Sequence, residues 1–160
     1  MGVLTYETEV ATGIPPTKMF KVFVLDADNI IPQILPQAIK SIEILEGNGG
    51  PGTIKKTTFA EGNEFKYVKN KIEAIDKDNF TYSYTSIEGE PWIDTLEKVY
   101  YEVKIVPSAD GGSICKTTSK YYPKGDSEIN EALIKAGEEK IMGMFKVIEA
   151  YLSANPGAYN

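Results

Sequence analysis

A long series of β-strand patterns followed by one amphipathic helix constrains the fold of this chain more than any other feature. From Ile39 to Tyr122, short apolar and β-branched runs alternate with segments rich in Gly, Asn, Asp and Pro. These connecting segments are of hairpin length, so the sheet is predicted to be an antiparallel meander. Its strands are predicted at residues 40–46, 53–60, 65–75, 79–87, 95–106 and 112–122.

After residue 130 the spacing of apolar residues changes from two to three or four. That spacing continues from Ile134 to Leu152 and predicts an amphipathic helix of about 24 residues. Asn130 is the predicted N-cap, and Asn155-Pro156-Gly157 is predicted to end the helix. The solvated face is predicted to carry Lys135, Glu138, Glu139, Lys146 and Glu149.

The N-terminal part of the chain adds one strand and two short helices. Residues 3–11 have a loose β alternation. Pro15 and Pro16 predict the start of a first helix, because proline suits a first helical turn. A second helix is predicted to follow Asp28 as its N-cap, and Pro32 and Pro36 limit its length.

These elements predict an α+β fold in which a strongly curved sheet grips the long C-terminal helix. One helix cannot fill a wide concave sheet, so we expect a large internal cavity. No linker, repeat or shift in composition divides the sequence, and residues 1–160 are therefore expected to form a single ligand-binding domain.

The chain contains no histidine and no arginine, and Cys115 is its single cysteine. Ser–His–Asp and Cys–His relays are therefore excluded, as are the usual zinc and non-haem iron sites, and we expect neither a metal nor a cofactor. The net charge of −6 argues against a nucleic-acid partner. A side-chain charge change near neutral pH would require a strongly shifted Asp, Glu, Lys or Cys. With no signal peptide and no membrane-spanning apolar run, a cytoplasmic protein without membrane contact is expected.

The ten tyrosines outnumber the six phenylalanines. Strand alternation places a group of them on the inner face of the sheet, namely Tyr67, Tyr82, Tyr84, Tyr101 and Tyr121. The predicted inner face of the last strand is small and polar, with Cys115, Thr117, Ser119 and Tyr121. Buried phenols need hydrogen-bond partners, so the cluster indicates either a semi-polar cavity or a core with its hydroxyls at the rim. Trp92, in a loop, is expected either to cap this cavity or to lie partly exposed.

The glycine-rich segment Gly47-Asn48-Gly49-Gly50-Pro51-Gly52 superficially resembles a phosphate-binding loop. The Lys-Ser/Thr pair that such a loop requires is replaced by Thr53-Ile54, and a strand rather than a helix follows. The segment is therefore interpreted as a rigid hairpin connection with several positive φ angles. Capture of an anion by its amides together with Lys55 stays open.

A set of dispersed motifs resembles the pathogenesis-related class 10 proteins, the birch pollen major allergen family. In order, the motifs are Tyr6-Glu7-Thr8-Glu9, Leu25-Asp26-Ala27-Asp28-Asn29, the loop Gly47–Lys56, Ile87-Glu88-Gly89, Asp110-Gly111-Gly112-Ser113, Lys120-Tyr121 and Glu149-Ala150-Tyr151-Leu152. The resemblance runs from residue 2 to residue 160. It implies a seven-stranded antiparallel sheet around the long helix, two short helices closing one end, and a large cavity.

The resemblance also implies a function in binding. It indicates a monomeric, stress- or defence-related intracellular carrier or storage protein for small amphipathic metabolites of the flavonoid, cytokinin, steroid or fatty-acid class. Antibodies of allergic individuals are further expected partners, with Glu46 and its loop on the recognised surface. By position, Lys55 would help orient a ligand, and the pocket residues would be Asp28, Ile39, Phe59, Phe65, Tyr67, Tyr82, Tyr84, Tyr101, Ala136, Gly137, Lys140, Ile141 and Met144.

The sequence departs from the family pattern at three places. Tyr122-Pro123 stand where relatives commonly have His-Thr, Glu90-Pro91-Trp92 is bulkier than the usual loop, and Ile141 replaces a residue that is often small. Two alternative functions remain. One is a weak ribonuclease, an activity attributed to family members, with Lys55, Glu97, Glu149 and Tyr151. The other is a small-molecule synthase in which Lys140 faces Tyr84 or Tyr101.

Overall fold

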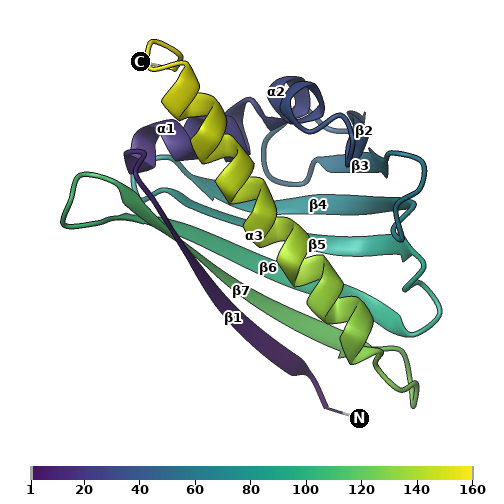
Figure 1. Cartoon of the computed structure of the whole chain (residues 1–160). Helices are drawn as coiled ribbons and strands as arrows, with labels where there is room; N and C mark the ends of the chain where they lie inside the picture. Colours follow the sequence, from purple (N-terminus) through teal and green to yellow (C-terminus); the bar gives the residue numbers. More distant parts are fainter. Residues whose placement is uncertain (1, 160) are drawn as a thin grey trace.

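A seven-stranded antiparallel sheet and one long helix make up most of the chain, of which the computed structural model describes residues 2–159 (Figure 1). The strand order across the sheet is β1-β7-β6-β5-β4-β3-β2. The strands are β1 Leu4–Thr12, β2 Ile39–Glu46, β3 Ile54–Phe59, β4 Tyr67–Asp76, β5 Thr81–Glu90, β6 Leu96–Pro107 and β7 Ser113–Pro123. The helices are α1 Pro16–Phe20, the π-helical turn η1 Lys21–Leu25, α2 Ala27–Ile34 and α3 Glu131–Ala154. The predicted α+β helix-grip fold is confirmed.

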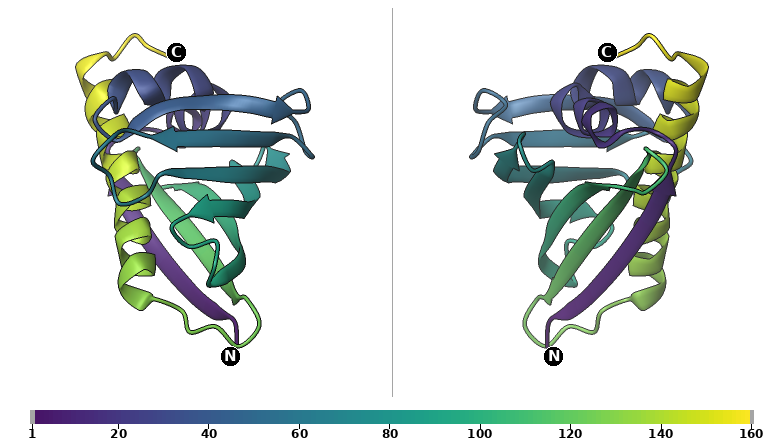
Figure 2. Two further views of the ribbon diagram at one scale, coloured as in Figure 1. Left: turned by 90° about the vertical axis from the view of Figure 1, so that its right-hand side faces the viewer. Right: turned by 90° about the vertical axis from the view of Figure 1, so that its left-hand side faces the viewer.

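The curved sheet and α3 face each other across the interior. Figure 1 shows α3 crossing in front of the sheet, and the two side views of Figure 2 show the helix along one side of the concave surface. α1 and α2 lie near the C-terminal end of α3 and close that end of the molecule. Strands β2 to β7 follow one another as hairpins, and β1 returns from the N-terminus to pair with β7.

Local sequence signals explain where the helices begin. Asn130 caps α3 through its side-chain oxygen, which accepts a hydrogen bond of 3.2 Å from the Leu133 amide. Pro16 occupies the first turn of α1, where its missing amide hydrogen costs nothing. The prediction of Asp28 as a cap was wrong. The N-cap position of α2 is Asp26, and Asp28 lies inside the first turn, where its side chain is free to reach β3.

The glycine-rich loop between β2 and β3 is wound around a buried hydroxyl. Thr53 is 1% exposed, and its side-chain oxygen accepts a hydrogen bond of 2.8 Å from the Gly49 amide. Gly47 has a φ of 96°, and a Cβ there would lie 2.6 Å from the same oxygen, so only glycine fits. The Gly50 amide donates to the Asn48 side chain. These two amides of the loop are thus bonded within the loop itself.

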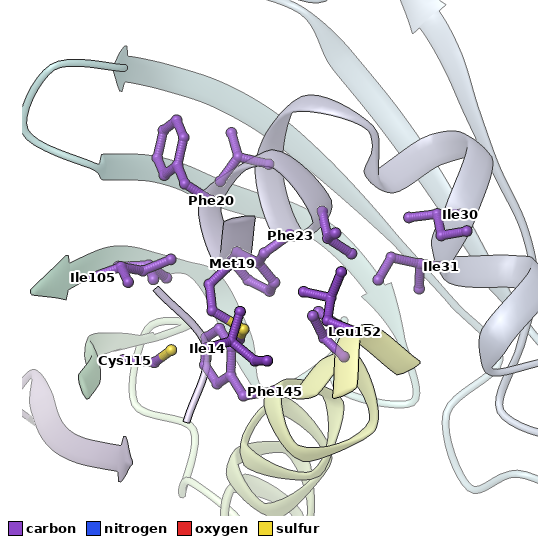
Figure 3. Close-up of a cluster of buried hydrophobic side chains, with 14 of the residues drawn as sticks. Ile14, Met19, Phe20, Phe23, Ile30, Ile31, Ile105, Cys115, Phe145 and Leu152 are labelled. Carbon is purple, nitrogen blue, oxygen red and sulfur yellow. The ribbon is translucent and has the colours of Figure 1, made fainter. Parts of the chain in front are cut away.

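The first core cluster fixes the C-terminal half of α3 against the short helices. Met19, Phe20 and Phe23 pack with Phe145 and Leu152, and Cys115 and Ile105 contribute from the sheet (Figure 3). The Phe23 and Phe145 rings lie 4.7 Å apart. Burial raises the pKa of the Cys115 thiol to about 12, so this cysteine is a packing residue.

The second core cluster lies near the N-terminal end of α3. It consists of Phe65, Trp92, Leu96, Val99, Tyr121 and Ile134. Trp92 is 7% exposed and belongs to this cluster, so the alternative of a partly exposed loop aromatic does not apply. The helix is therefore held to the sheet by apolar packing at its two ends.

Phe145→Ala tests how strongly the first cluster anchors α3. The ring is completely buried, and its loss is expected to lower the free energy of unfolding by about 3–5 kcal/mol, since a cavity remains. Urea unfolding followed by circular dichroism measures the change.

Gly143→Ala is the matched control on the same helix. Gly143 is exposed, and a Cβ there meets no atom within 4 Å, so alanine is expected to raise stability by about 1 kcal/mol. A Phe145→Ala protein that loses less than about 1 kcal/mol would contradict the anchoring function of this cluster.

Candidate ligand-binding cavity

A cavity of about 190 Å³ lies between α3, α2 and the concave face of the sheet. It occupies the space that the two core clusters leave open. Its walls are formed by Phe23, Ala27, Asp28, Ile31, Ile39, Ile42, Lys55, Thr57, Phe59, Phe65, Val68, Asn70, Tyr82, Tyr84, Ser86, Trp92, Tyr101, Gly137, Lys140, Ile141 and Met144. The lining is mainly aliphatic and aromatic with a few polar groups, which is the composition of sites for small amphipathic molecules.

Three tyrosines of β5 and β6 form an aromatic wall of this cavity. Tyr82 and Tyr84 are alternate residues of β5, and Tyr84 pairs with Tyr101 of β6. Their ring centroids are 5.1 Å apart for Tyr82 and Tyr84, and 4.9 Å for the stacked Tyr84 and Tyr101. Burial raises the pKa of all three phenols, so their hydroxyls stay neutral over the physiological range.

An ion pair joins α2 to the sheet at the cavity wall. The Lys55 ammonium of β3 lies 2.8 Å from the Asp28 carboxylate. The Lys55 side chain is 13% exposed and the Asp28 side chain 33%, so the pair is partly screened from water. The lysine is thus paired with Asp28, and the glycine-loop amides are bonded elsewhere, so these groups do not assemble into the anion site that the sequence left open.

Lys140 lies on the helix side of the cavity. Its ammonium is 3.4 Å from the Asn63 side-chain oxygen and 5.7 Å from the centroid of the Phe65 ring. These contacts hold the lysine toward the segment between β3 and β4. The Lys140 ammonium is therefore directed toward Asn63 and Phe65, and not toward Tyr84 or Tyr101 as the synthase alternative requires.

Most residues singled out in the sequence lie together on the cavity wall, but Tyr67 and Ala136 do not. The inward placement of Tyr67 was wrong, because β4 begins only at Tyr67 and the irregular segment before it breaks the alternation with Phe65. Val68 faces the cavity, and Tyr67 faces the other side, where its hydroxyl donates 2.6 Å to Glu88. Ala136 packs against the second core cluster.

Several lining residues were missed, chiefly on the short helices and on β4. Strand register identifies two of them, because Thr57 and Val68 are paired and share the inner face. Asn70 follows Val68 by simple alternation and pairs with Lys55, so it also faces inward, and its side-chain oxygen accepts a hydrogen bond of 2.6 Å from Ser86. It was missed because the inward placement of Tyr67 assigned Asn70 to the outer face. Phe23, Ala27 and Ile31 were missed because no face was assigned to the short helices.

The four residues of the ribonuclease alternative do not form a connected group. Glu149 accepts hydrogen bonds from the Gly13 amide at 2.7 Å and from Lys146 at 3.0 Å. Lys55 is paired with Asp28, and Glu97 is exposed on β6. Glu149 therefore fastens the turn after β1 to α3, which is a structural function.

Glu138 is a buried carboxylate that the sequence pattern assigned to the solvated face. It is 5% exposed, and its Oε2 accepts a hydrogen bond of 3.3 Å from Ser119 of β7, whereas its Oε1 has no partner among the described residues. Thr117 and Ser119 thus face α3 and do not line the cavity. Desolvation raises the pKa of Glu138, and the Ser119 and Tyr121 hydroxyls partly oppose this rise. Helical periodicity did not predict the burial of Glu138, because the part of β7 that this side chain faces is polar.

Within residues 2–159, no cluster of three or more Cys, Asp or Glu side chains is arranged to hold a metal ion. The same part of the chain contains no helix of the length and apolarity needed to cross a membrane.

Comparison with known proteins gives consistent matches over the whole chain. The model of the "Pathogenesis-related protein Bet v 1 family" matches residues 1–155. Major allergen Pru av 1 of Prunus avium is 61% identical over 160 residues, and major allergen Pru ar 1 of Prunus armeniaca is 60% identical, with 100% of each chain covered. The crystal structure of Ara h 8.0201 is 44% identical, with a TM-score of 0.84 over 96% of this chain and 99% of that one. Norcoclaurine synthase from Thalictrum flavum has a TM-score of 0.79 at 23% identity over 94% and 87% of the chains, which supports the fold alone.

Glu138→Gln tests the buried carboxylate. A carboxyl group whose pKa is raised by folding stabilises the folded state only while protonated, so its contribution is lost as pH rises above the ordinary value of 4.5. The glutamine variant is expected to match the unmodified protein near pH 4 and to become relatively more stable with rising pH. The gain should be about 1.4 kcal/mol for each unit by which the pKa is raised.

Glu139→Gln is the matched control, since Glu139 is the exposed neighbour on α3. This exposed substitution should change the free energy of unfolding by less than about 0.5 kcal/mol at pH 7. Urea unfolding of the three proteins at several pH values makes the comparison. A difference between Glu138→Gln and the unmodified protein that stays constant from pH 4 to pH 8 would contradict the raised pKa.

Proposed function

The chain belongs to the pathogenesis-related protein Bet v 1 family, and from that premise we propose that it is an intracellular carrier or storage protein for small amphipathic plant metabolites. We propose the flavonoid, cytokinin, steroid and fatty-acid classes as ligands. The observation that carries this proposal is the mainly apolar cavity with its stacked tyrosine wall.

The tyrosine wall suits flat ring systems. Tyr82, Tyr84 and Tyr101 give the cavity an aromatic lining, and offset or edge contacts of a planar ligand with aromatic rings are favourable. Burial is the main cause that raises the pKa of the Tyr82 and Tyr84 phenols, so their hydroxyls stay protonated and can donate to a ligand oxygen. Neutral phenols of this kind recognise hydroxyl and carbonyl groups without requiring ligand charge.

The energetics favour an amphipathic ligand over a purely apolar one. Burial of about 300 Å² of apolar surface contributes about 7.5 kcal/mol, and the loss of ligand freedom opposes this gain. Micromolar affinity corresponds to about 8 kcal/mol. Hydrogen bonds to Tyr82, Tyr84 or the Lys55–Asp28 pair are therefore needed as well, and these bonds would set the orientation of the ligand.

The wider biological proposals rest on the family. We propose a monomeric protein of the cytosol that accumulates in stress or defence and is recognised by antibodies raised against related allergens. The relatives named major allergens support the last point, and Glu46 with the adjoining glycine-rich loop is exposed. We favour binding over ribonuclease activity because Lys55 and Glu149 are each bonded to other groups.

Gly137→Leu tests whether the cavity is the binding site. Gly137 lines the cavity, and a Cβ there would already lie 3.6 Å from the Phe65 ring, so the rest of a leucine side chain must occupy ligand space. Binding of the flavonoid naringenin, measured by calorimetry and by quenching of the single tryptophan, is expected to weaken at least tenfold.

Gly143→Leu supplies the matched control, because it places the same side chain on the same helix in open space. Its affinity should equal that of the unmodified protein within about twofold, a difference of about 0.4 kcal/mol. Equal affinities of Gly137→Leu and Gly143→Leu for naringenin would show that the ligand does not bind in this cavity. No saturable binding to the unmodified protein by naringenin, a cytokinin, a sterol or a fatty acid would refute the carrier proposal.

A further inference from the structure

A second, smaller hollow lies beside the main cavity. Its volume is about 40 Å³, and it extends toward the N-terminal end of α3. Four residues line both spaces, namely Phe65, Trp92, Tyr101 and Gly137. We call these four residues the dividing wall. The remaining lining of the second hollow is mainly apolar and comprises Thr95, Leu96, Val99, Tyr121, Ile129, Asn130, Leu133 and Ile134.

The members of the dividing wall differ in how firmly they are held. Tyr101 is fixed within β6, stacked on Tyr84 and edge-on to Tyr121. Gly137 has no side chain. Phe65 and Trp92 lie in the connections before β4 and before β6, so these two rings are the parts of the wall that a substitution removes without altering the tyrosine stack.

The Trp92 indole is built into its position. A Cβ on Gly89 would lie 2.5 Å from Cε2 and Nε1 of the indole, so the ring packs directly on the backbone of β5 and requires glycine there. The Trp92 carbonyl accepts hydrogen bonds of 3.0 Å from the Thr95 and Leu96 amides. The indole is therefore fixed in place where it lines both hollows.

We propose that Trp92 sets the maximum length of ligand that the cavity accepts. With the indole in place, the main cavity binds compact ring compounds more tightly than long alkyl chains. Without it, the two hollows become one elongated space whose far end, at Leu96, Leu133 and Ile134, suits an alkyl chain. This inference rests on the proposed carrier function and adds a determinant of ligand class to it. Each further methylene buried would improve affinity about fourfold.

Trp92→Leu tests the partition with two fluorescent probes of different length. The compact probe is 8-anilinonaphthalene-1-sulfonate, and the long probe is the 18-carbon fatty acid cis-parinaric acid. We expect the variant to bind parinaric acid at least tenfold more tightly than the unmodified protein does, which corresponds to about two newly buried methylenes. Affinity for the compact probe should change less than affinity for the long probe, because Trp92 lines both spaces and only the long probe extends into the second hollow.

Phe20→Leu is the control for the loss of a buried aromatic ring. Phe20 is 2% exposed, belongs to the first core cluster and does not line either hollow. Phe20→Leu should leave the ratio of the affinities for parinaric acid and 8-anilinonaphthalene-1-sulfonate unchanged. Trp92→Phe retains a smaller ring and should give an intermediate ratio. Thermal unfolding of all variants verifies that each is folded.

The outcomes separate the partition from the carrier function. If Trp92→Leu leaves the ratio of the two affinities unchanged, Trp92 does not limit ligand length. The carrier function is not affected by that result. If neither probe binds to any of the proteins, the fatty-acid part of the carrier proposal fails, and xenon-pressurised crystals of Trp92→Leu then decide the partition alone. Xenon in the space vacated by the indole, bridging the two hollows, supports it. A Phe65 ring that moves into this space and keeps the hollows apart overturns it.

Discussion

α3 packs through apolar clusters near its two ends, and between them it borders the cavity and contacts β7 through Glu138; the rest of the structure depends on this arrangement. Ile134 belongs to one core cluster and Phe145 to the other. They are 11 residues apart in the sequence, which is about 16 Å along a helix. A helix is only about 10 Å wide and the concave sheet is broader, so the middle of the interface cannot close. Gly137 enlarges the gap where a side chain would have filled it. The cavity is thus a consequence of one helix facing one curved sheet.

Polar groups in this interior fall into two sets with different consequences. Tyr82 and Tyr84 face open space and can hydrogen bond to whatever enters it. Glu138 faces Ser119 and Tyr121 of the sheet, where its ionised form would be poorly solvated. The first set offers hydrogen-bonding groups to a ligand. The second set joins α3 to β7 through a carboxylate whose pKa is raised by burial, in a chain that contains no histidine.

The sequence predicts the fold well because its periodicities are long and regular. The strand series, the capped C-terminal helix and the inner faces of β5, β6 and β7 follow from alternation and spacing alone. The family resemblance then adds the cavity and most of its lining. Tyr67 was misplaced because the irregular segment before β4 breaks the alternation with Phe65, and Asn70 was missed because the same error moved every second residue of β4 to the wrong face. Glu138 was misassigned because helical spacing identifies a face but not the polarity of the surface that the face meets.

The most direct test of the central claim is where a bound ligand lies relative to the methyl groups of the protein. Intermolecular nuclear Overhauser effects with methyl-labelled protein and naringenin measure this. The account predicts contacts with Ile42, Ile141 and Met144, which line the cavity. Contacts confined to Ile44, Leu45 and Ile87, the exposed aliphatic residues of β2 and β5, would contradict it.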